Sequence, residues 1–296
     1  MDLLRGIIPP LVTPFRSDGE LDRAAFEANL DSYAGEDLAG YLVLGSNGEA
    51  ATLDEGEKLS LVALARKASG SRRLLVGTGL ESTRATMLLT AKVADLGADA
   101  ALVLTPHYYK SQMTQEALRA YFEAVADASP IPVLLYSVPS FTSLPFPPGL
   151  AAGLAGHPKI VGMKESSGDL VLLSRILSTV PPSFSVACGS TPVLYPALCL
   201  GARAGILAVA CCAPSASASL YRAFESGDFE RALRIQRSLT PLATAVTSLY
   251  GVPGLKRAME LAGRRGGFVR APLLGAGPAR DAELKALLAQ ALEGAA

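Results

Sequence analysis

Hydrophobic and polar positions follow a regular succession along the first 225 or so residues. Short apolar runs that are typical of buried strands are each followed by a longer segment with an apolar position every three or four residues, which is typical of a helix with one buried face. The predicted strands span residues 6–12, 41–44, 74–78, 100–104, 133–136, 160–164, 184–188 and 204–209. The predicted helices lie near residues 22–34, 53–68, 82–95, 114–128, 147–155, 168–179, 191–200 and 214–226.

Eight strand–helix pairs in a chain of this length predict an α/β fold, a closed (β/α)8 TIM barrel. An open doubly wound sheet is disfavoured because no G-x-G-x-x-G turn follows the first strand. The remaining sequence has no strand pattern and predicts helices near residues 228–248, 253–263 and 280–293. We therefore expect residues 1–226 to form the barrel with the active site, and residues 227–296 to form a C-terminal helical appendage.

Two local signals place helix ends. Thr52 followed three residues later by Glu55 predicts a capping box at the start of the second helix, and Gly97 predicts the end of the third.

Composition excludes several classes of partner. The chain has 296 residues, of which 50% are hydrophobic and 18% charged, enough for the large core of one soluble unit. Lys plus Arg and Asp plus Glu both total 27, and no basic block is present, so neither nucleic acid nor a membrane surface is an expected partner. A small neutral or anionic metabolite is expected instead.

Targeting and metal signals are also weak. No apolar run reaches the length of a membrane span, and Asp2, Pro9 and Pro10 interrupt the start where a signal peptide needs an apolar region, so we expect a cytoplasmic protein. The cysteines lack metal-ligand spacing and are expected to be small core residues in a reducing compartment, and the two histidines are expected in loops, so no metal or other cofactor is predicted. These residues are Cys188, Cys199, Cys211, Cys212, His107 and His157.

Lys164 is the most unusual polar residue of the pattern, because it ends a short apolar strand and would lie at the rim of the barrel. Burial favours the neutral form of an amine, which is the form that attacks a carbonyl carbon. The alternative is a side chain that extends into water and pairs with Glu165 or Asp169. The other seven lysines are expected on helical faces or loops, where water solvates them: Lys58, Lys67, Lys92, Lys110, Lys159, Lys256 and Lys285.

Other chemistry-bearing residues follow neighbouring strands, where a barrel places its catalytic groups. Residues 45–49 (Gly-Ser-Asn-Gly-Glu) contain residue types that tolerate positive φ, so successive backbone N–H groups could face one anion, with the Ser46 hydroxyl beside them. The segment lacks the Gly-Lys-Ser/Thr of a phosphate loop, which favours a carboxylate as the anion; the alternative is an ordinary tight turn. Tyr136 could present its hydroxyl at the same rim, or it could be a core tyrosine with one hydrogen bond.

An amine, a phenol and an anion-binding turn at one rim are the parts of an imine-forming lyase. The amine would condense with a ketone, the phenol would move protons, and the turn would hold a carboxylate next to the ketone.

At these residues the sequence resembles the pyruvate-dependent aldolases that include dihydrodipicolinate synthase, N-acetylneuraminate lyase and 4-hydroxy-2-oxoglutarate aldolase. The similarity runs nearly end to end, through residues 251–256 (Gly-Val-Pro-Gly-Leu-Lys) and 270–273 (Arg-Ala-Pro-Leu). The resemblance implies that Lys164 forms the Schiff base, that Tyr136 is the acid/base group and that the Ser46 hydroxyl passes protons.

The resemblance also implies the rest of the site. The backbone of Ser46 and Asn47 would hold the pyruvate carboxylate, and the carbonyls of Gly189 and Ile206 would line the pocket. Tyr108 would reach into the site of a neighbouring subunit, which implies a dimer and usually a homotetramer built as a dimer of dimers. Because Tyr109 is adjacent, which of the two tyrosines crosses is left open.

The predicted substrate is a 2-oxo acid, and the motifs are most similar to those of 4-hydroxy-2-oxoglutarate aldolase, which yields pyruvate and glyoxylate. Dihydrodipicolinate synthases carry an Arg where this chain has Phe141, and an apolar ring cannot replace a bidentate guanidinium. Ser166 is the predicted contact to the distal carboxylate; alternatively it caps the helix that starts near Gly168. The aldehyde and the stereochemistry at C4 stay open.

Three other functions remain as alternatives: a 2-keto-3-deoxy sugar-acid aldolase, a 4-hydroxy-tetrahydrodipicolinate synthase, and a non-catalytic barrel that binds pyruvate as a sensor or scaffold.

Overall fold

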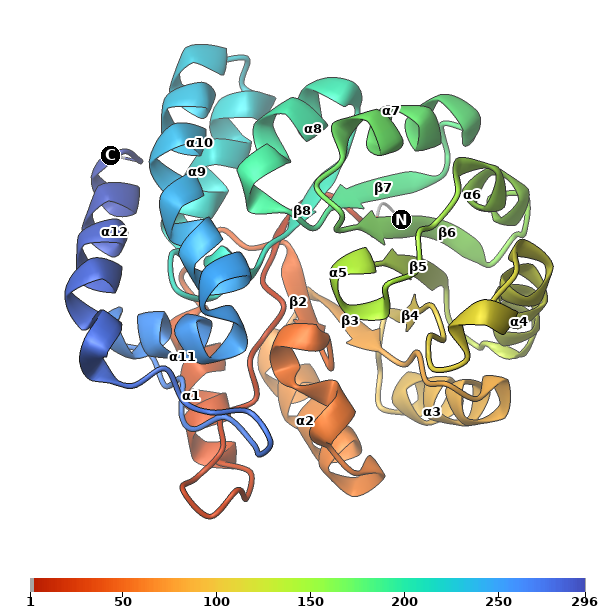
Figure 1. Ribbon diagram of the computed structural model, residues 1–296, viewed down its shortest axis with the longest axis horizontal. Coiled ribbons are helices and arrows are strands. Elements are labelled where there is room, and N and C mark those ends of the chain that lie inside the picture. Colours follow the sequence, from red (N-terminus) through yellow and green to blue (C-terminus); the bar gives the residue numbers. More distant parts are fainter. Residues whose placement is uncertain (1–2, 296) are drawn as a thin grey trace.

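The computed structural model describes residues 3–295, and within them eight parallel strands form one sheet that curls into a barrel (Figure 1). Strands β2 to β8 pair in the order of the sequence, and β1 pairs with β8, which gives the order β1-β8-β7-β6-β5-β4-β3-β2. This arrangement confirms the predicted TIM barrel. The strands are β1 (Gly6–Ile8), β2 (Gly40–Val43), β3 (Arg73–Gly77), β4 (Ala100–Leu104), β5 (Val133–Ser137), β6 (Ile160–Glu165), β7 (Ser185–Cys188) and β8 (Ala204–Ile206).

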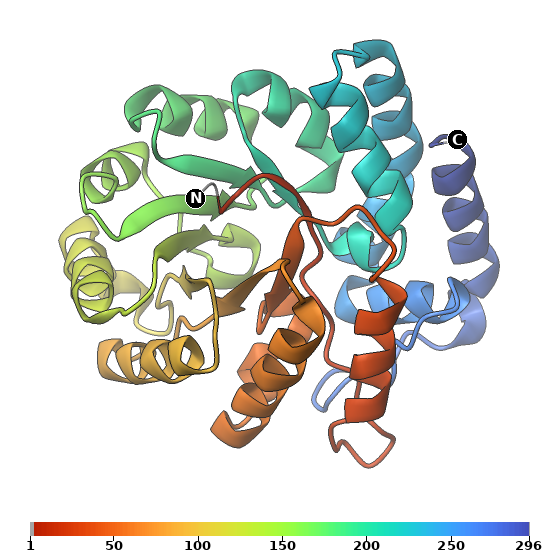
Figure 2. The same cartoon turned by 180° about the vertical axis from the view of Figure 1, so that it is seen from behind.

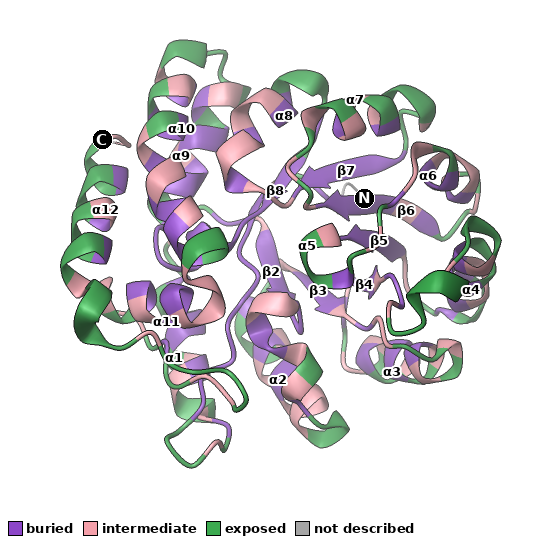
Figure 3. Cartoon of the chain, viewed as in Figure 1, coloured by how far each residue is buried: buried purple, intermediate pink, exposed green. Residues whose placement is uncertain are grey.

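Helices surround the strands, and the exposed residues lie on the outer faces of the helices and in the loops (Figure 3). The ring consists of α1 (Arg23–Ser32), α2 (Glu55–Ser69), α3 (Thr83–Asp95), α4 (Gln115–Ala128), α5 (Pro139–Thr142), α6 (Pro148–Leu154), α7 (Leu170–Thr179), α8 (Leu194–Leu200) and α9 (Pro214–Glu225). The short α5 was not predicted. The capping box of α2 is formed by Asp54 and Glu57 rather than by the predicted Thr52 and Glu55, because Asp54 accepts from the Glu57 N–H and Glu57 accepts from the Asp54 N–H.

The barrel closes between β1 and β2 through an irregular segment. The N–H of Leu11 donates to the Leu42 carbonyl (2.8 Å), and the Leu42 N–H donates to the Pro9 carbonyl (3.1 Å). Pro9 and Pro10 have no N–H to extend a regular ladder, so β1 ends at Ile8 and not at residue 12 as predicted. Likewise β8 ends at Ile206, because a 3-10 helix (Ala208–Cys211) replaces the rest of the predicted 204–209 strand.

Side chains alternate between two apolar layers along each strand. In β5, Leu134 and Tyr136 belong to the cluster inside the barrel, whereas Val133 and Leu135 face the helices. Figure 2 shows the first described residues of the chain lying across one end of the barrel, and Leu3 and Leu4 accordingly belong to the inner cluster.

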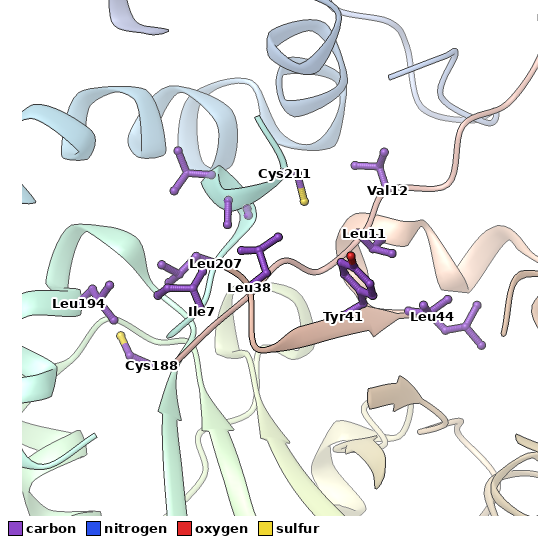
Figure 4. Close-up of a cluster of buried hydrophobic side chains, with 14 of the residues drawn as sticks. Ile7, Leu11, Val12, Leu38, Tyr41, Leu44, Cys188, Leu194, Leu207 and Cys211 are labelled. Atoms are coloured by element: carbon purple, nitrogen blue, oxygen red, sulfur yellow. The ribbon is translucent and has the colours of Figure 1, made fainter. Parts of the chain in front are cut away.

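The outer layer continues across the closing segment of the barrel. Figure 4 shows Tyr41 and Leu44 of the β2 region beside Leu11 and Val12, which follow β1. Tyr41 is fully buried, and this packing covers the strand pair that the prolines leave with few backbone hydrogen bonds.

Three further helices follow the barrel: α10 (Phe229–Thr244), α11 (Gly251–Leu261) and α12 (Asp281–Glu293). The predicted C-terminal helices are therefore present, and Figure 1 shows them beside α9 at one flank of the ring. A π-helical turn (Ala245–Leu249) ends α10. The division of the chain at residue 226 stays a prediction.

Two surface predictions were wrong. Lys256 was expected to be solvated, but its side chain is 2% exposed, because α11 packs that face against Phe15 and Glu49. Cys199 was expected in the core, but it is exposed on α8. None of the helices in residues 3–295 combines the length and the apolarity that a bilayer-crossing segment needs.

Gly162 of β6 offers a test of the barrel packing, because a Cβ built there lies 2.3 Å from the backbone oxygen of Ser185 on β7. We expect Gly162→Ala to lower the free energy of unfolding by about 1–3 kcal/mol or more, since the neighbouring backbone must move. Gly149→Ala is the matched control: its Cβ meets nothing within 4 Å at the start of α6, and it should stabilise by about 0.4–1 kcal/mol. Urea denaturation measures both, and equal effects of the two substitutions would contradict the packing described here.

Candidate active site

The pairing of β5 with β6 brings the two main candidate residues together. Val133 pairs with Ile160, but Leu134 pairs with Gly162, so Val161 has no partner on β5. This one-residue shift sets Tyr136 directly beside Lys164. Without the shift Tyr136 would pair with Met163, and because successive side chains of a strand point to opposite faces, the phenol and the amine would lie on different faces of the sheet.

Lys164 and Tyr136 are both 5% exposed, so the amine is buried at the strand end. Lys164 Nζ donates to the Tyr136 hydroxyl at 3.4 Å and lies 4.5 Å from the centre of its ring. The Tyr136 hydroxyl lies 3.3 Å from Ser46 Oγ. The amine, the phenol and the Ser46 hydroxyl therefore form a chain of three groups along which a proton can pass. The alternative, in which Lys164 extends into water to pair with Glu165 or Asp169, is wrong.

The turn after β2 carries Ser46 and Asn47, both half-buried, on a 3-10 helix (Ser46–Gly48). Its geometry differs from the predicted one, because Gly45, Asn47 and Gly48 do not adopt positive φ. Leu44 (φ 59°) before the turn and Glu49 (φ 51°) after it do so instead. The two flanking residues thus turn the backbone, and the 3-10 helix presents its first N–H groups, which lack helical partners.

Glu49, Lys256 and Arg270 hold this turn from the outside, and the sequence-based prediction missed all three. Lys256 Nζ lies 2.5 Å from Glu49 Oε1, and the Arg270 N–H donates to Glu49 Oε2 at 2.9 Å. The Arg270 guanidinium donates to the Thr52 carbonyl (2.9 Å) and to both oxygens of Glu57 (2.6 and 2.7 Å). The presence of an acid in the turn and of bases in the C-terminal residues was visible, but no local pattern connects positions so far apart in the chain.

Ser166 and Gly189 lie next to the amine. A Cβ on Gly189 would lie 2.9 Å from Lys164 Cε and 1.9 Å from Ser166 Oγ, so only glycine fits between them. Ser166 Oγ is buried and has no hydrogen-bond partner among the described residues. The alternative capping role for Ser166 is wrong, because Asp169 caps α7 by accepting from the N–H groups of Val171 and Leu172. A buried hydroxyl without a partner beside the amine is available to a ligand.

Of the remaining predicted residues, Ile206 is buried inside the barrel, whereas the two tyrosines after β4 are exposed. Ile206 ends β8 and belongs to the inner cluster with Tyr136. Tyr108 and Tyr109, which follow β4, are 74% and 68% exposed, and their rings meet edge to face with centroids 5.0 Å apart. Within residues 3–295 the Tyr108 hydroxyl forms no hydrogen bond with Tyr136 or Ser46. The structure of one chain therefore gathers Lys164, Tyr136, Ser46 and Ser166, but it leaves both tyrosines of the β4 loop at the surface.

Glu165 is a second buried ionisable group at the end of β6, on the opposite face from Lys164. It is 3% exposed, and its Oε1 accepts from the Ser167 N–H at 2.8 Å. Burial raises the pKa of this carboxyl above its usual value, although the contacts with Ser167 oppose the rise. Its backbone carbonyl accepts from the Gly189 N–H at 2.7 Å, so Glu165 ties the loop after β6 to the end of β7.

Neither the histidines nor the cysteines form a metal centre. His107 Nδ1 lies 2.9 Å from Glu81, and His157 Nε2 lies 3.1 Å from Asp127, both in loops as predicted. Among the residues that the structure describes, no group of three or more His, Cys, Asp or Glu side chains could hold a metal ion. Cys188, at the end of β7, is buried, and burial raises the pKa of its thiol to about 12.

Comparison with known proteins places this site in a family. The model of the dihydrodipicolinate synthetase family matches residues 3–291. The chain belongs to this family.

Individual members match over nearly the whole length. The chain is 33% identical over 290 residues to the 4-hydroxy-tetrahydrodipicolinate synthase of Exiguobacterium sp. AT1b, covering 97% of this chain and 98% of the relative. It is 36% identical over 291 residues to the enzyme of the same name from Methanoculleus marisnigri, covering 97% and 99%. It also matches the structure of YagE from E. coli K12, a prophage protein of the dihydrodipicolinic acid synthase family in complex with pyruvate, with a TM-score of 0.90, 32% identity and coverage of 97% and 98%.

These names bear on the predicted resemblance. The family is confirmed, but none of the three proteins carries the name 4-hydroxy-2-oxoglutarate aldolase. Phe141, at the position where the resemblance implies an arginine in dihydrodipicolinate synthases, lies on α5 and is 60% exposed.

Glu165→Gln tests the electrostatic cost of the buried carboxyl. Because the folded state raises the pKa of Glu165, it prefers the protonated acid, so stability is lost as pH rises above the unfolded value. Gln resembles the protonated acid and keeps an acceptor for the Ser167 N–H. We expect Glu165→Gln to melt at a higher temperature than the wild type at pH 7, with the difference shrinking toward pH 4. Glu293→Gln, at an exposed position of α12, controls for loss of a charge; a pH-independent difference would contradict the stated cause.

Proposed function

We propose that this protein is a Schiff-base enzyme that forms or cleaves a carbon–carbon bond next to pyruvate, as a class I aldolase or synthase. The observation that carries the proposal is the chain of Lys164 Nζ, the Tyr136 hydroxyl and Ser46 Oγ, with separations of 3.4 and 3.3 Å, at the carboxyl ends of three strands. A pyruvate-binding sensor or scaffold needs no such arrangement, because binding alone does not use a nucleophilic amine.

The proposed reaction proceeds through an imine. Lys164 Nζ attacks the C2 ketone, and Tyr136 passes the protons by which the carbinolamine loses one water to become a protonated imine. Loss of a proton from C3 gives an enamine, whose electrons form the new bond to the second substrate; cleavage runs the same step in reverse. Hydrolysis of the imine then returns the free amine and the product.

The turn after β2 is the proposed binding site for the carboxylate next to the ketone. The N–H groups of Ser46 and Asn47 stand at the start of a 3-10 helix, where they have no helical acceptor. Gly189 leaves space beside Lys164 Cε, and Ile206 forms part of the apolar wall. This turn therefore fixes the keto acid while the amine attacks.

Two second substrates deserve a test. The names of the relatives favour 4-hydroxy-tetrahydrodipicolinate synthase, since the relatives from Exiguobacterium and Methanoculleus described above carry this name and match over nearly their whole length. Phe141 favours 4-hydroxy-2-oxoglutarate cleavage instead, because no guanidinium stands at that position and the buried Ser166 hydroxyl is free to contact a distal carboxylate. The pyruvate half of the reaction is the same in both.

We also propose a homo-oligomer. The two exposed aromatic rings of Tyr108 and Tyr109 lie side by side on the β4 loop, and aromatic side chains are enriched where proteins meet. The resemblance implies that one of these two hydroxyls then reaches the site of the second copy.

Trapping with borohydride tests the proposed function. Reduction in the presence of pyruvate should add a pyruvate-derived mass to the peptide that contains Lys164, because borohydride fixes an imine as a stable amine. Lys164→Ala should lose both the adduct and turnover. Tyr136→Phe should keep the fold and lower kcat by about 10²–10⁴-fold, since it removes only the proton-transfer group. An adduct on another lysine, or none with the wild type, would overturn the proposal.

A substrate panel decides the second substrate. The panel pairs pyruvate with the aldehyde of the synthase reaction, and compares it with 4-hydroxy-2-oxoglutarate and a 2-keto-3-deoxy sugar acid as cleavage substrates. We expect Phe141→Arg to raise kcat/KM for the synthase reaction by about tenfold or more, because a charged bidentate contact replaces an apolar ring. Phe141→Lys is the control for charge without the fork. Robust cleavage of the sugar acid alone would remove both candidates.

A further inference from the structure

A buried ion pair links the C-terminal helix α11 to the turn that carries Ser46 and Asn47. Lys256 and Glu49 have side chains that are 2% and 1% exposed, with Nζ and Oε1 2.5 Å apart. The same ammonium donates to the Phe268 carbonyl at 2.5 Å and lies 4.7 Å from the centre of the Phe15 ring. Lys256, on α11, is therefore held in place by contacts with the turn after β2, with the segment after α11 and with the loop after β1.

At Glu49 the backbone changes direction between two short helices. This residue stands between two 3-10 helices, Ser46–Gly48 and Ala50–Thr52, with φ 51° and ψ 35°. A residue with a side chain is unfavourable in this left-handed region, and such a conformation persists only where the surroundings hold it. Here both carboxylate oxygens are held, one by the Lys256 ammonium and the other by the Arg270 N–H.

Contributions to stability do not explain this pair. Burial, together with the nearby charge of Arg270, lowers the pKa of Lys256 to about 8, although Glu49 acts to raise it. Buried ion pairs of this kind are often no more stable than apolar residues of the same size. The pair instead fixes the position of Glu49, and through Glu49 the position of the 3-10 helix Ser46–Gly48.

The backbone transmits that position over a short distance. The Glu49 N–H donates to the Ser46 carbonyl at 3.1 Å, so Glu49 and Ser46 are the two ends of one hydrogen-bonded turn. On the other side of the turn, Ser46 Oγ lies 3.3 Å from the Tyr136 hydroxyl. A shift of Glu49 would move the Ser46 hydroxyl and the N–H groups of Ser46 and Asn47 together.

We propose that Lys256 is a positioning residue for the reaction: by holding Glu49 it sets the turn that receives the carboxylate of the 2-oxo acid and keeps Ser46 in contact with Tyr136. This inference rests on the proposed function, and it assigns to the C-terminal appendage a part in substrate binding that Lys164, Tyr136 and Ser46 do not account for.

Three variants test the inference by separating binding from stability. Lys256→Met removes the ammonium and leaves a buried carboxylate without its ion-pair partner. Glu49→Gln removes the negative charge and keeps the shape. The double variant removes both charges and has no buried charge left at these two positions. Arg257→Met is the matched control, because Arg257 is the next residue of α11 and its ion pair joins Asp281 on α12 without touching the turn.

The expected result is a KM for pyruvate at least about tenfold higher in all three variants and changed less than twofold in Arg257→Met, since small misplacements of a positioning group carry costs of this size. Melting temperature should fall in Lys256→Met and recover in the double variant, whereas KM should not recover. At saturating pyruvate, borohydride should still label Lys164 in every variant, because the amine itself is unchanged.

Several outcomes would overturn the inference. A wild-type KM in Lys256→Met, or a double variant that regains KM together with melting temperature, would show that the pair has only an electrostatic role in folding. If Lys256→Met does not fold, the double variant decides; if neither folds, Glu49→Gln decides, and an unchanged KM there contradicts the inference. Absence of a pyruvate adduct in the wild type would instead refute the proposed function, so the two failures are distinguishable.

Discussion

The register between β5 and β6 is the constraint on which the site depends. A parallel pair normally advances one residue against one residue, and here Val161 is passed over, so that Tyr136 stands beside Lys164. The consequence is chemical, because a side chain displaced by one position in a strand points to the other face of the sheet. A single unpaired residue near the start of β6 thus decides whether the Tyr136 phenol and the Lys164 amine lie on the same face of the sheet.

The barrel shields Tyr136 and Lys164 from water, but it does not provide their polar neighbours. Tyr136 belongs to the apolar cluster inside the barrel, and Lys164 has the same small exposure. The polar partners come from the loops: Ser46 from the turn after β2, and Ser166 and Gly189 from the loops after β6 and β7. This division between a rigid strand end and adaptable loops is usual for TIM barrels, in which loop variation lets one scaffold carry different chemistries.

Periodicity predicted the barrel and the C-terminal helices well, because each strand and helix is set by the local pattern of apolar residues. It placed Lys164 and Tyr136 at strand ends, which brings both to one rim, but it could not predict the shift at Val161, since pairing register depends on two strands together. It also failed for Lys256. The sequence around that lysine is an ordinary helix, and its burial depends on Glu49 and Phe15, which are distant in the chain.

Backbone conformation was also not predictable from the local sequence. The glycines and the asparagine of residues 45–49 suggested a left-handed turn, yet Leu44 and Glu49 take the positive φ values. Residue preferences describe what a backbone tolerates locally, and here tertiary contacts with Arg270 and Lys256 overrule them. The helix α5, which carries Phe141, was missed for a different reason, because its four residues are too few to show any periodicity.

The contacts of Arg270 and Lys256 with Glu49 also determine the order in which parts of the site can form during synthesis. All eight strands are complete once β8 has been synthesised, but both residues that anchor Glu49 come later in the chain, after α10. A nascent polypeptide on the ribosome could therefore close its barrel while the turn after β2 is still unsecured. A product of premature termination just after β8 would carry Lys164 on a complete β6 together with an unanchored turn after β2, so the segment that follows α10 completes a site whose strands were made earlier.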